Sequence, residues 1–193
     1  MLCRSSDISW YTARMALIGE EEVSMRLRKL ELKDAPFMLE WMHDESVVEN
    51  LQTRFGEKTM EDCELFITNS LKDRENLHLA IVDDTDTYMG TISLKHITDD
   101  SAEFGITIRR CAMGQGYAKR AMEIILQKGL QDMKLKQIYW CVNPQNRRAI
   151  RFYDKNRYQK IDHLDSDTIS MLCEAGIYNN AQIEAYIWYQ IKI

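Results

Sequence analysis

The chain has 193 residues, which is enough for one domain with a sizeable core and short for two. Its hydrophobic content of 45% and its charged content of 28% are those of an ordinary globular protein, and no apolar run approaches the length of a membrane span. The net charge of −5, without a long basic patch, argues against a nucleic-acid backbone as the main partner and agrees with a cationic substrate such as an amine.

Cysteine and histidine usage gives no sign of disulfides or of a structural metal. The 5 cysteines are odd in number, far apart and without the Cys-x-x-Cys spacing of zinc sites, and no signal-peptide pattern is present. We therefore predict free thiols, a cytoplasmic location and no bound metal. The cysteines are Cys3, Cys63, Cys111, Cys141 and Cys173.

Residues 1–24 show little pattern, and the first recognisable strand begins at Met25. Codons for Gly19 to Glu22 can spell a purine-rich ribosome-binding site at a reasonable distance upstream of Met25. We therefore hypothesise that residues 1–24 are an N-terminal extension that is not native and that residues 25–193 form the domain. The alternative interpretation is a frayed or accessory N-terminal arm.

The first part of the domain predicts a strand, two helices and a hairpin. The strand covers residues 25–30, and Asp34 can cap the helix that follows, with a proline in its first turn. A second helix begins at Thr59, with its apolar residues on one side. Alternating strands at residues 77–81 and 89–97 then flank an aspartate-rich turn.

The next strand and the turn after it carry the first functional signal. In the strand over residues 103–109, Phe104, Ile106 and Ile108 form an apolar face, and Glu103, Gly105 and Thr107 form the other face. The following turn contains Gly114 and Gly116 and leads into a helix that ends near Gly129. Glycines there let the backbone approach a ligand, and exposed N–H groups at a helix start attract phosphate oxygens. The alternative interpretation is a tight strand-to-helix turn that binds nothing.

The remaining sequence predicts a second strand and helix. The strand covers residues 137–143, and with the preceding strand and helix it makes a parallel βαβ unit, whose crossover is right-handed in nearly all cases. In the helix over residues 144–156, Asn146, Ala149, Ile150 and Tyr153 fall on one face. Strands are expected at residues 158–163 and 183–193, whereas the turn-rich residues 164–180 give no assignment.

Two motifs in these segments resemble the GNAT superfamily of acetyl-CoA-dependent N-acetyltransferases. The first, Cys111-Ala-Met-Gly114-Gln-Gly116, is similar to the family's phosphate turn, Arg/Gln-x-x-Gly-x-Gly/Ala. The second starts at Asn146 and is similar to Asn-x-x-Ala-x-x-x-Tyr-x-x-x-Gly-Phe/Tyr. Two positions depart from these patterns, because Cys111 stands where Arg or Gln is usual and Arg157 stands where Gly is usual.

The resemblance implies the GNAT fold, an α/β (α+β) architecture with one mixed, mostly antiparallel sheet, helices on both faces and a central parallel βαβ unit. The run Glu40-Trp-Met-His-Asp44 resembles a feature of the branch related to ribosomal-protein N-terminal alanine acetyltransferases, in which this region borders the acceptor pocket. From the residues alone, Trp41 is better interpreted as a core aromatic, and His43 and Asp44 as polar residues at a helix end.

The resemblance also implies a binding site for acetyl-CoA. Its pyrophosphate would lie on backbone N–H groups of the glycine turn, and its pantetheine arm would lie between the strands over residues 103–109 and 137–143, which splay apart in the family. The implied cofactor-binding residues are Ile106, Thr107, Ile108, Met113, Gly114, Gln115, Gly116, Tyr117, Ala118 and Asn146.

Two residues are candidates for proton transfer. Tyr153 would sit near the thioester sulfur, where a phenol with a pKa of about 10 is a reasonable proton donor to a thiolate. The alternative for Tyr153 is a buried aromatic whose hydroxyl meets a backbone carbonyl. Glu103 is the candidate base, acting directly or through water, and its alternative is a solvated charge at a strand end.

The expected activity is transfer of an acetyl group from acetyl-CoA to a primary amine, which could be a protein N-terminus, a polyamine, an amino sugar or an aminoglycoside-like compound. The partner would be that small-molecule or peptide amine rather than nucleic acid or a membrane, and the chain would be a monomer or a homodimer. The alternative is a non-catalytic acyl-CoA-binding regulatory module, which would not need Tyr153 or Glu103. A dinucleotide-binding oxidoreductase is disfavoured, because the third small residue of its glycine motif would fall at Lys119.

Overall fold

The computed structural model describes residues 23–51 and 53–193. The expected extension over residues 1–24 lies outside this part of the chain, apart from its last two residues. The first strand begins at Met25, but the start of the native chain stays a prediction.

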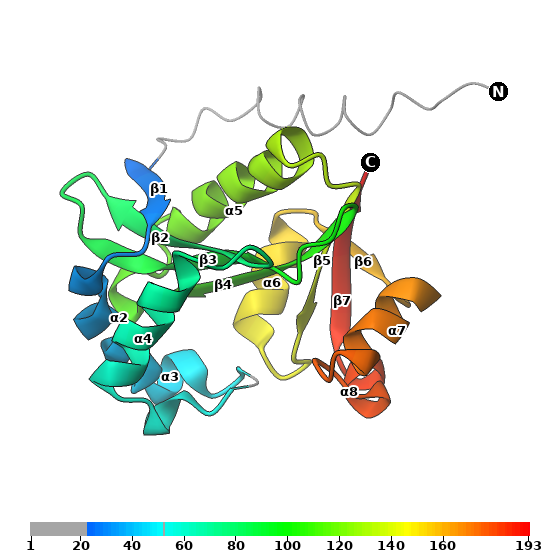
Figure 1. Cartoon of the computed structure of the whole chain (residues 1–193), viewed down its shortest axis with the longest axis horizontal. Coiled ribbons are helices and arrows are strands. Elements are labelled where there is room, and N and C mark those ends of the chain that lie inside the picture. Colours follow the sequence, from blue (N-terminus) through cyan, green and yellow to red (C-terminus); the bar gives the residue numbers. More distant parts are fainter. Residues whose placement is uncertain (1–22, 52) are drawn as a thin grey trace.

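Seven strands form one mixed sheet in the described residues, in the order β1-β2-β3-β4-β5-β7-β6 (Figure 1). Neighbouring strands are antiparallel except β4 and β5, which run parallel. The mostly antiparallel sheet and its central βαβ unit confirm the predicted fold class. The strands are β1 (Met25–Lys29), β2 (Leu77–Asp83), β3 (Tyr88–Lys95), β4 (Ser101–Ile108), β5 (Gln137–Val142), β6 (Gln159–Ile161) and β7 (Ile187–Lys192).

Helices cover both faces of this sheet. One face carries α5 (Tyr117–Gln127), which makes the crossover from β4 to β5, and α6 (Arg147–Lys155). The other face carries two separate groups of helices, which Figure 1 shows near opposite ends of the sheet. The first group is α2 (Ala35–Met42), α3 (Glu45–Val48) and α4 (Met60–Ser70), over β2 and β3, and the second is α7 (Ser166–Glu174) and α8 (Asn180–Ala185), over β5 and β7. Among the described helices, none is both long and apolar enough to cross a membrane.

The core follows from the apolar stripes of these elements. In α5, Ala121, Met122, Ile125 and Leu126 recur at helical spacing and have no exposed surface, which buries one side of this helix against the sheet. On the opposite face, Trp41 of α2 is buried, and its indole Nε1 donates a hydrogen bond of 3.1 Å to the Tyr88 hydroxyl. This contact confirms the interpretation of Trp41 as a core aromatic.

The C-terminal segment differs from the expectation. Residues 164–180 contain α7, and the expected strand over residues 183–193 is wrong at its beginning, because Asn180–Ala185 form α8. A reciprocal capping box explains the difference, since Asn179 Oδ1 accepts from Gln182 N and Asn179 N donates to Gln182 Oε1, both at 2.9 Å. Ile183 then packs with the buried side chains under this helix. A few alternating apolar residues fit one helical turn as well as a strand, and the cap decides between them.

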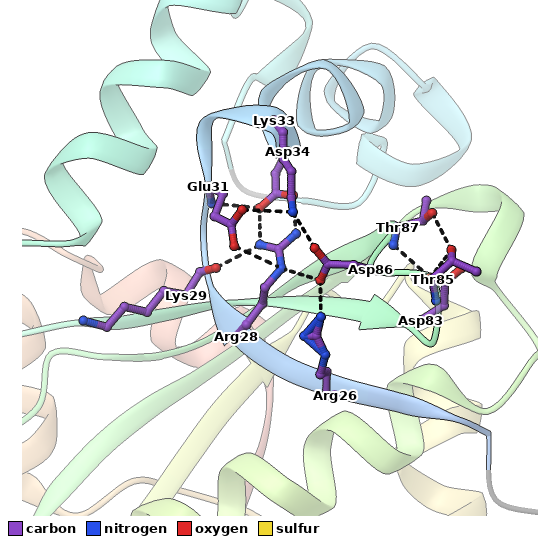
Figure 2. A network of polar contacts seen from close by, with 10 residues as sticks. All are labelled: Arg26, Arg28, Lys29, Glu31, Lys33, Asp34, Asp83, Thr85, Asp86 and Thr87. Atoms are coloured by element: carbon purple, nitrogen blue, oxygen red, sulfur yellow. Dashed lines mark hydrogen bonds and ion pairs between the residues drawn. The ribbon is translucent and has the colours of Figure 1, made fainter.

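Asp34 also differs from the expectation, because its side chain does not cap α2. It instead accepts two hydrogen bonds of 2.7 Å from the Arg28 guanidinium and one of 2.9 Å from Glu31 N (Figure 2). Only 1% of Asp34 is exposed. The carboxylate therefore belongs to a buried, bidentate ion pair with β1.

Asp86, in the turn between β2 and β3, joins the same network. Arg28 Nε donates to its Oδ1 at 2.9 Å, and the side chains of Arg26 and Lys33 also bind it (Figure 2). Lys33 and Arg28 lower the pKa of Asp86 to about 2. The network fastens β1 and the short 3₁₀ helix Leu32–Asp34 to the β2–β3 hairpin.

The chain turns out of α6 at Arg157, which has a left-handed φ of 56°. Arg157 N donates to Asp154 O at 2.9 Å and Tyr158 N donates to Tyr153 O at 3.1 Å, the pattern of a Schellman cap. Glycine is favoured at this position because other residues meet a steric penalty there. The departure from the family motif at Arg157 thus keeps the cap's hydrogen bonds and adds backbone strain.

Replacing Arg157 by Gly is expected to raise the free energy of unfolding by about 1 kcal/mol, because the strain is relieved and the exposed side chain loses no packing. Urea unfolding would measure the change. As a control, Arg151→Gly at an exposed interior position of α6 should lower the free energy of unfolding by about 1 kcal/mol. A destabilised Arg157→Gly variant would contradict the prediction.

Candidate active site

Strands β4 and β5 part soon after they begin. Their parallel pairing stops at Glu103 and Tyr139, although both strands continue beyond this point. On their outer edges both strands stay paired, β4 with β3 and β5 with β7. The inner edges therefore carry backbone N–H and C=O groups without a partner on the facing strand, which a ligand can use. Ile106, Thr107 and Ile108 lie on the β4 edge, the first two partly exposed.

Two left-handed glycines build the turn between β4 and α5. Gly114 has a φ of 78°, and Gly116, the N-cap of α5, has a φ of 92°. A Cβ added at Gly114 would meet no atom within 4 Å, so the backbone there borders open space. Gln115, between the glycines, donates from Nε2 to Cys111 O at 2.6 Å. The Gln115 side chain therefore braces the turn.

The start of α5 offers N–H groups rather than side chains. Arg120 N is the first to find a helical acceptor, Gly116 O at 3.1 Å. The N–H groups of Tyr117 and Ala118 precede it and have no intrahelical acceptor, and the first turn carries no acidic residue. The side chains of Tyr117, Ala118 and Met113 pack on the core. These residues can therefore hold an anion through their backbone, with the helix dipole in favour.

Asn146 is positioned by α6, of which it is the N-cap. Its Oδ1 accepts a hydrogen bond of 3.0 Å from Ala149 N. The spacing of Asn146 and Ala149 in the motif is therefore explained by this N-cap hydrogen bond. Within the described residues the side-chain NH₂ of Asn146 has no hydrogen-bond partner, and it can donate to a ligand.

Tyr153 lies in an aromatic cluster and is 6% exposed. Its ring centroid is 5.5 Å from that of Trp140 and 5.1 Å from that of Tyr189. Tyr153 is thus a buried aromatic, as the alternative interpretation expects, but no described residue forms a hydrogen bond with its hydroxyl. The catalytic role of Tyr153 stays a prediction. Burial raises the pKa of Tyr153 well above its usual value, and the phenol keeps its proton.

Glu103 is 3% exposed, so the alternative of a solvated charge is wrong. Its Oε1 accepts hydrogen bonds from Lys95 Nζ at 2.8 Å and from the Tyr178 hydroxyl at 2.9 Å. Its Oε2 is buried and has no hydrogen-bond partner in the described part of the chain. A buried carboxylate oxygen without a donor is costly unless water or a ligand reaches it.

The register of the sheet puts Tyr153 and Glu103 on opposite faces. Tyr153 packs on the α5 face with Phe104 and Trp140. Glu103 alternates with Phe104 along β4, and its partner Tyr139 on β5 packs under α7 and α8. Tyr139 is the last paired residue of β5 and Trp140 is the first beyond the pairing. A phenol and a carboxylate therefore flank the point where the two strands part.

Sequence reasoning missed Lys95 and Tyr178, which hold Glu103. Lys95 lies directly opposite Glu103 in the β3–β4 pair, so the register of the predicted hairpin could have indicated it. Tyr178 comes from the segment between α7 and α8, and no local pattern points to it. Its hydroxyl also lies 3.3 Å from Cys141 Sγ, and burial raises the pKa of Cys141 to about 12. Cys141 is therefore a protonated thiol rather than a nucleophile.

The polar residues after α2 have structural roles, as the residue pattern indicates. A ring nitrogen of His43, Nε2, bonds Lys58 O at 2.8 Å, and Asp44 caps α3 by accepting from Ser46 N at 3.0 Å. Arg148 of α6 reaches the same place and donates to Ser46 O at 3.3 Å. The start of α6 thus lies beside α3.

Comparison with known proteins agrees with this geometry. A model of the acetyltransferase (GNAT) domain matches residues 24–159. The uncharacterized N-acetyltransferase p20 of Bacillus licheniformis is 28% identical over 141 residues, which cover 70% of this chain and 79% of p20.

Solved acetyltransferase structures share the fold. A spermidine N-acetyltransferase from Vibrio cholerae, in complex with CoA and spermine, superposes with a TM-score of 0.70 at 19% identity, covering 88% of this chain and 95% of that one. A GNAT-family acetyltransferase from Bacillus anthracis gives a TM-score of 0.68 at 20% identity, covering 89% and 96%. Because the domain model matches more than half of this chain, the chain belongs to the GNAT family of acetyltransferases.

Proposed function

We propose that this acetyltransferase takes its acetyl group from acetyl-CoA and transfers it to a primary amine. The observation that carries the proposal is the parting of β4 and β5, with an open glycine turn beyond it and with Tyr153 and Glu103 on its two faces. The solved V. cholerae relative that contains CoA supports the choice of co-substrate.

The residues of this chain fit acetyl-CoA. The open backbone at Gly114 and the N–H groups at the start of α5 suit a pyrophosphate. The unpaired edge of β4 at residues 106–108 and the side-chain NH₂ of Asn146 can hydrogen-bond the amides of a pantetheine arm. When bound, acetyl-CoA supplies the acetyl group as a thioester.

Protons move through two residues in this proposal. Tyr153, whose hydroxyl is free of partners in the described chain, donates its proton to the departing thiolate, and the phenolate regains a proton from the substrate nitrogen as the amide forms. Glu103 takes the proton of the incoming ammonium group, directly or through water, while Lys95 and Tyr178 hold its other oxygen in place. A backbone N–H on the inner edge of β4 polarises the acetyl carbonyl.

A polyamine is the first acceptor to test, because the V. cholerae relative is a spermidine acetyltransferase whose structure contains spermine. A protein N-terminus is the second, because residues 40–44 resemble the ribosomal-protein branch. Within that run Trp41 is buried, so any contact with a peptide would fall to the exposed side chains beside it. Amino sugars and aminoglycoside-like amines complete the panel.

Thiol release from acetyl-CoA should be measured with spermidine, an alanine-initiated peptide, an amino sugar and an aminoglycoside, each against a blank without amine. We expect release that depends on at least one amine. Calorimetric binding of acetyl-CoA without turnover on any of them would favour the non-catalytic acyl-CoA-binding module. Absence of binding would contradict both interpretations.

Gly114→Ala is expected to weaken acetyl-CoA binding about tenfold, equivalent to about 1.4 kcal/mol, because its Cβ would enter the open space where we place the pyrophosphate. Gly176→Ala is the matched control, since Gly176 also has a left-handed φ, of 67°, and also borders open space, but lies after α7. Both variants carry similar backbone strain. Calorimetry should show weaker binding only for Gly114→Ala, and equal affinities in the two variants would contradict the placement.

A further inference from the structure

Beside the oxygen of Glu103 that has no hydrogen-bond partner, Oε2, lies His96, a residue that the proposed mechanism does not use. Lys95 and Tyr178 both bind Oε1 and fix the orientation of the carboxylate. Oε2 is left buried without a hydrogen bond, and His96 Nε2 lies 3.6 Å from it. A base that removes one proton in each turnover must release that proton before the next, and a carboxylate with 3% exposure has little direct contact with water.

His96 connects this oxygen to the outside. Its side chain is 30% exposed, so the imidazole contacts both solvent and the buried carboxylate. A rotation that shortens the 3.6 Å separation by a few tenths of an ångström would complete a hydrogen bond to Glu103 Oε2.

The backbone of His96 is held in an uncommon conformation. Its φ is 51°, in the left-handed region that a non-glycine residue rarely adopts. His96 N donates to Asn76 Oδ1 at 3.0 Å, and Asn76 is fixed in turn by two hydrogen bonds to Asp73. Strain that a surrounding network maintains at one residue points to a positioned side chain.

The charged and titratable groups around His96 favour a neutral imidazole. Burial lowers the pKa of His96, and the positive charge of Lys95 on β3 lowers it further. The Glu103 carboxylate on β4 raises the pKa and so opposes both effects. Glu75, on the segment before β2, raises the pKa, and His78 on β2 lies near enough to interact. A neutral imidazole at neutral pH can accept a proton.

We propose that His96 is the outlet for the proton that Glu103 takes from the amine. The ammonium N–H bond breaks as an O–H bond forms at Glu103 Oε2. That O–H bond then breaks as an N–H bond forms at His96 Nε2, and the imidazolium releases the proton to water. Glu103 and His96 return to their starting states, and no electrons are exchanged. The inference rests on the proposed function, because it assigns His96 a positioning and relay role behind the base.

The test uses His96→Asn, because asparagine tolerates a left-handed φ and keeps the backbone hydrogen bond while removing the imidazole. With acetyl-CoA and spermidine, or the panel amine that turns over fastest, we expect kcat to fall about tenfold and the KM for acetyl-CoA to stay the same. Added imidazole should restore part of the rate. The wild-type rate should fall as the pH drops through the His96 pKa, and this limb should be missing in His96→Asn.

His163→Asn is the matched control, because His163 is exposed and lies outside this cluster. It should leave both rate and pH profile unchanged. If Glu103→Gln lowers turnover but His96→Asn alters neither the rate nor the acidic limb, the relay is overturned and the base role stands. If both variants keep full turnover, the base and the relay fall together.

A second measurement needs no acceptor. The chain has 4 histidines, so an NMR titration can follow each imidazole separately. Because the Glu103 carboxylate raises the pKa of His96, Glu103→Gln should lower the His96 pKa. An unchanged His96 pKa would overturn the inference even if acetyl transfer is confirmed.

Discussion

Replacing Tyr153 by Phe is expected to lower turnover tenfold or more while the affinity for acetyl-CoA changes little. The substitution removes one oxygen and keeps the ring, which packs against Trp140 and Tyr189. The hydroxyl has no partner in the described residues, so its loss breaks no hydrogen bond inside the protein. The effect should therefore fall on the step that protonates the leaving thiolate. Thiol-release kinetics and calorimetry, on the same samples, would measure the two quantities.

The control for this experiment comes from the same aromatic cluster. The Tyr189 hydroxyl donates to Asp154 Oδ1 at 3.0 Å, so Tyr189→Phe removes a hydroxyl with a structural partner. That variant should lose about 1 kcal/mol of stability and keep its turnover. Because burial raises the Tyr153 pKa, the phenol should remain protonated, and no loss of rate from its ionisation is expected up to pH 10. Unchanged turnover in Tyr153→Phe would remove Tyr153 from the mechanism.

Asp34→Asn is expected to lower the free energy of unfolding by about 3 kcal/mol. The substitution keeps the size of the side chain but leaves the Arg28 guanidinium without its buried bidentate partner, and Arg28 is itself only 12% exposed. Urea unfolding, followed by the fluorescence of Trp41 and the other buried indoles, would measure the change.

A second variant shows whether the loss comes from the ion pair. Arg28→Met should also destabilise the protein, and the double variant Arg28→Met/Asp34→Asn should cost less than the sum of the two single changes, because it leaves no unpaired buried charge. Strictly additive losses would show that the two side chains act independently. Asp86→Asn should have a smaller effect than Asp34→Asn, since Asp86 is more exposed.

Local patterns predict the geometry of the glycine turn and of the start of α6. The two glycines have left-handed φ angles, and Asn146, Ala149 and Tyr153 share one helix face with the cap that their spacing implies. Each of these features depends on residues within about two helical turns of one another, which is the range over which sequence periodicity is informative.

The surroundings of Glu103 depend on contacts between distant segments. Glu103 looks like an exposed strand end until Tyr178, which is 75 residues away, is placed against it. Asp34 departs from its expected use for a different reason, because its actual partner is Arg28, only 6 residues away on the preceding strand. The charge-assisted, bidentate pair with Arg28 is stronger than a helix-capping hydrogen bond would be.

The short joint between β4 and β5 has a consequence for how the enzyme could be tuned. The four-stranded and three-stranded halves of the sheet meet through a parallel ladder of three residue pairs, Ser101–Gln137, Ala102–Ile138 and Glu103–Tyr139. Tyr153 packs with the three-stranded half, and Glu103 lies on β4 of the four-stranded half. The distance between these two side chains therefore depends on the angle between the halves at this joint. Ala102 and Ile138 are fully buried in this ladder. A bulkier side chain at either position is therefore expected to shift the backbone and change the angle between the two halves of the sheet.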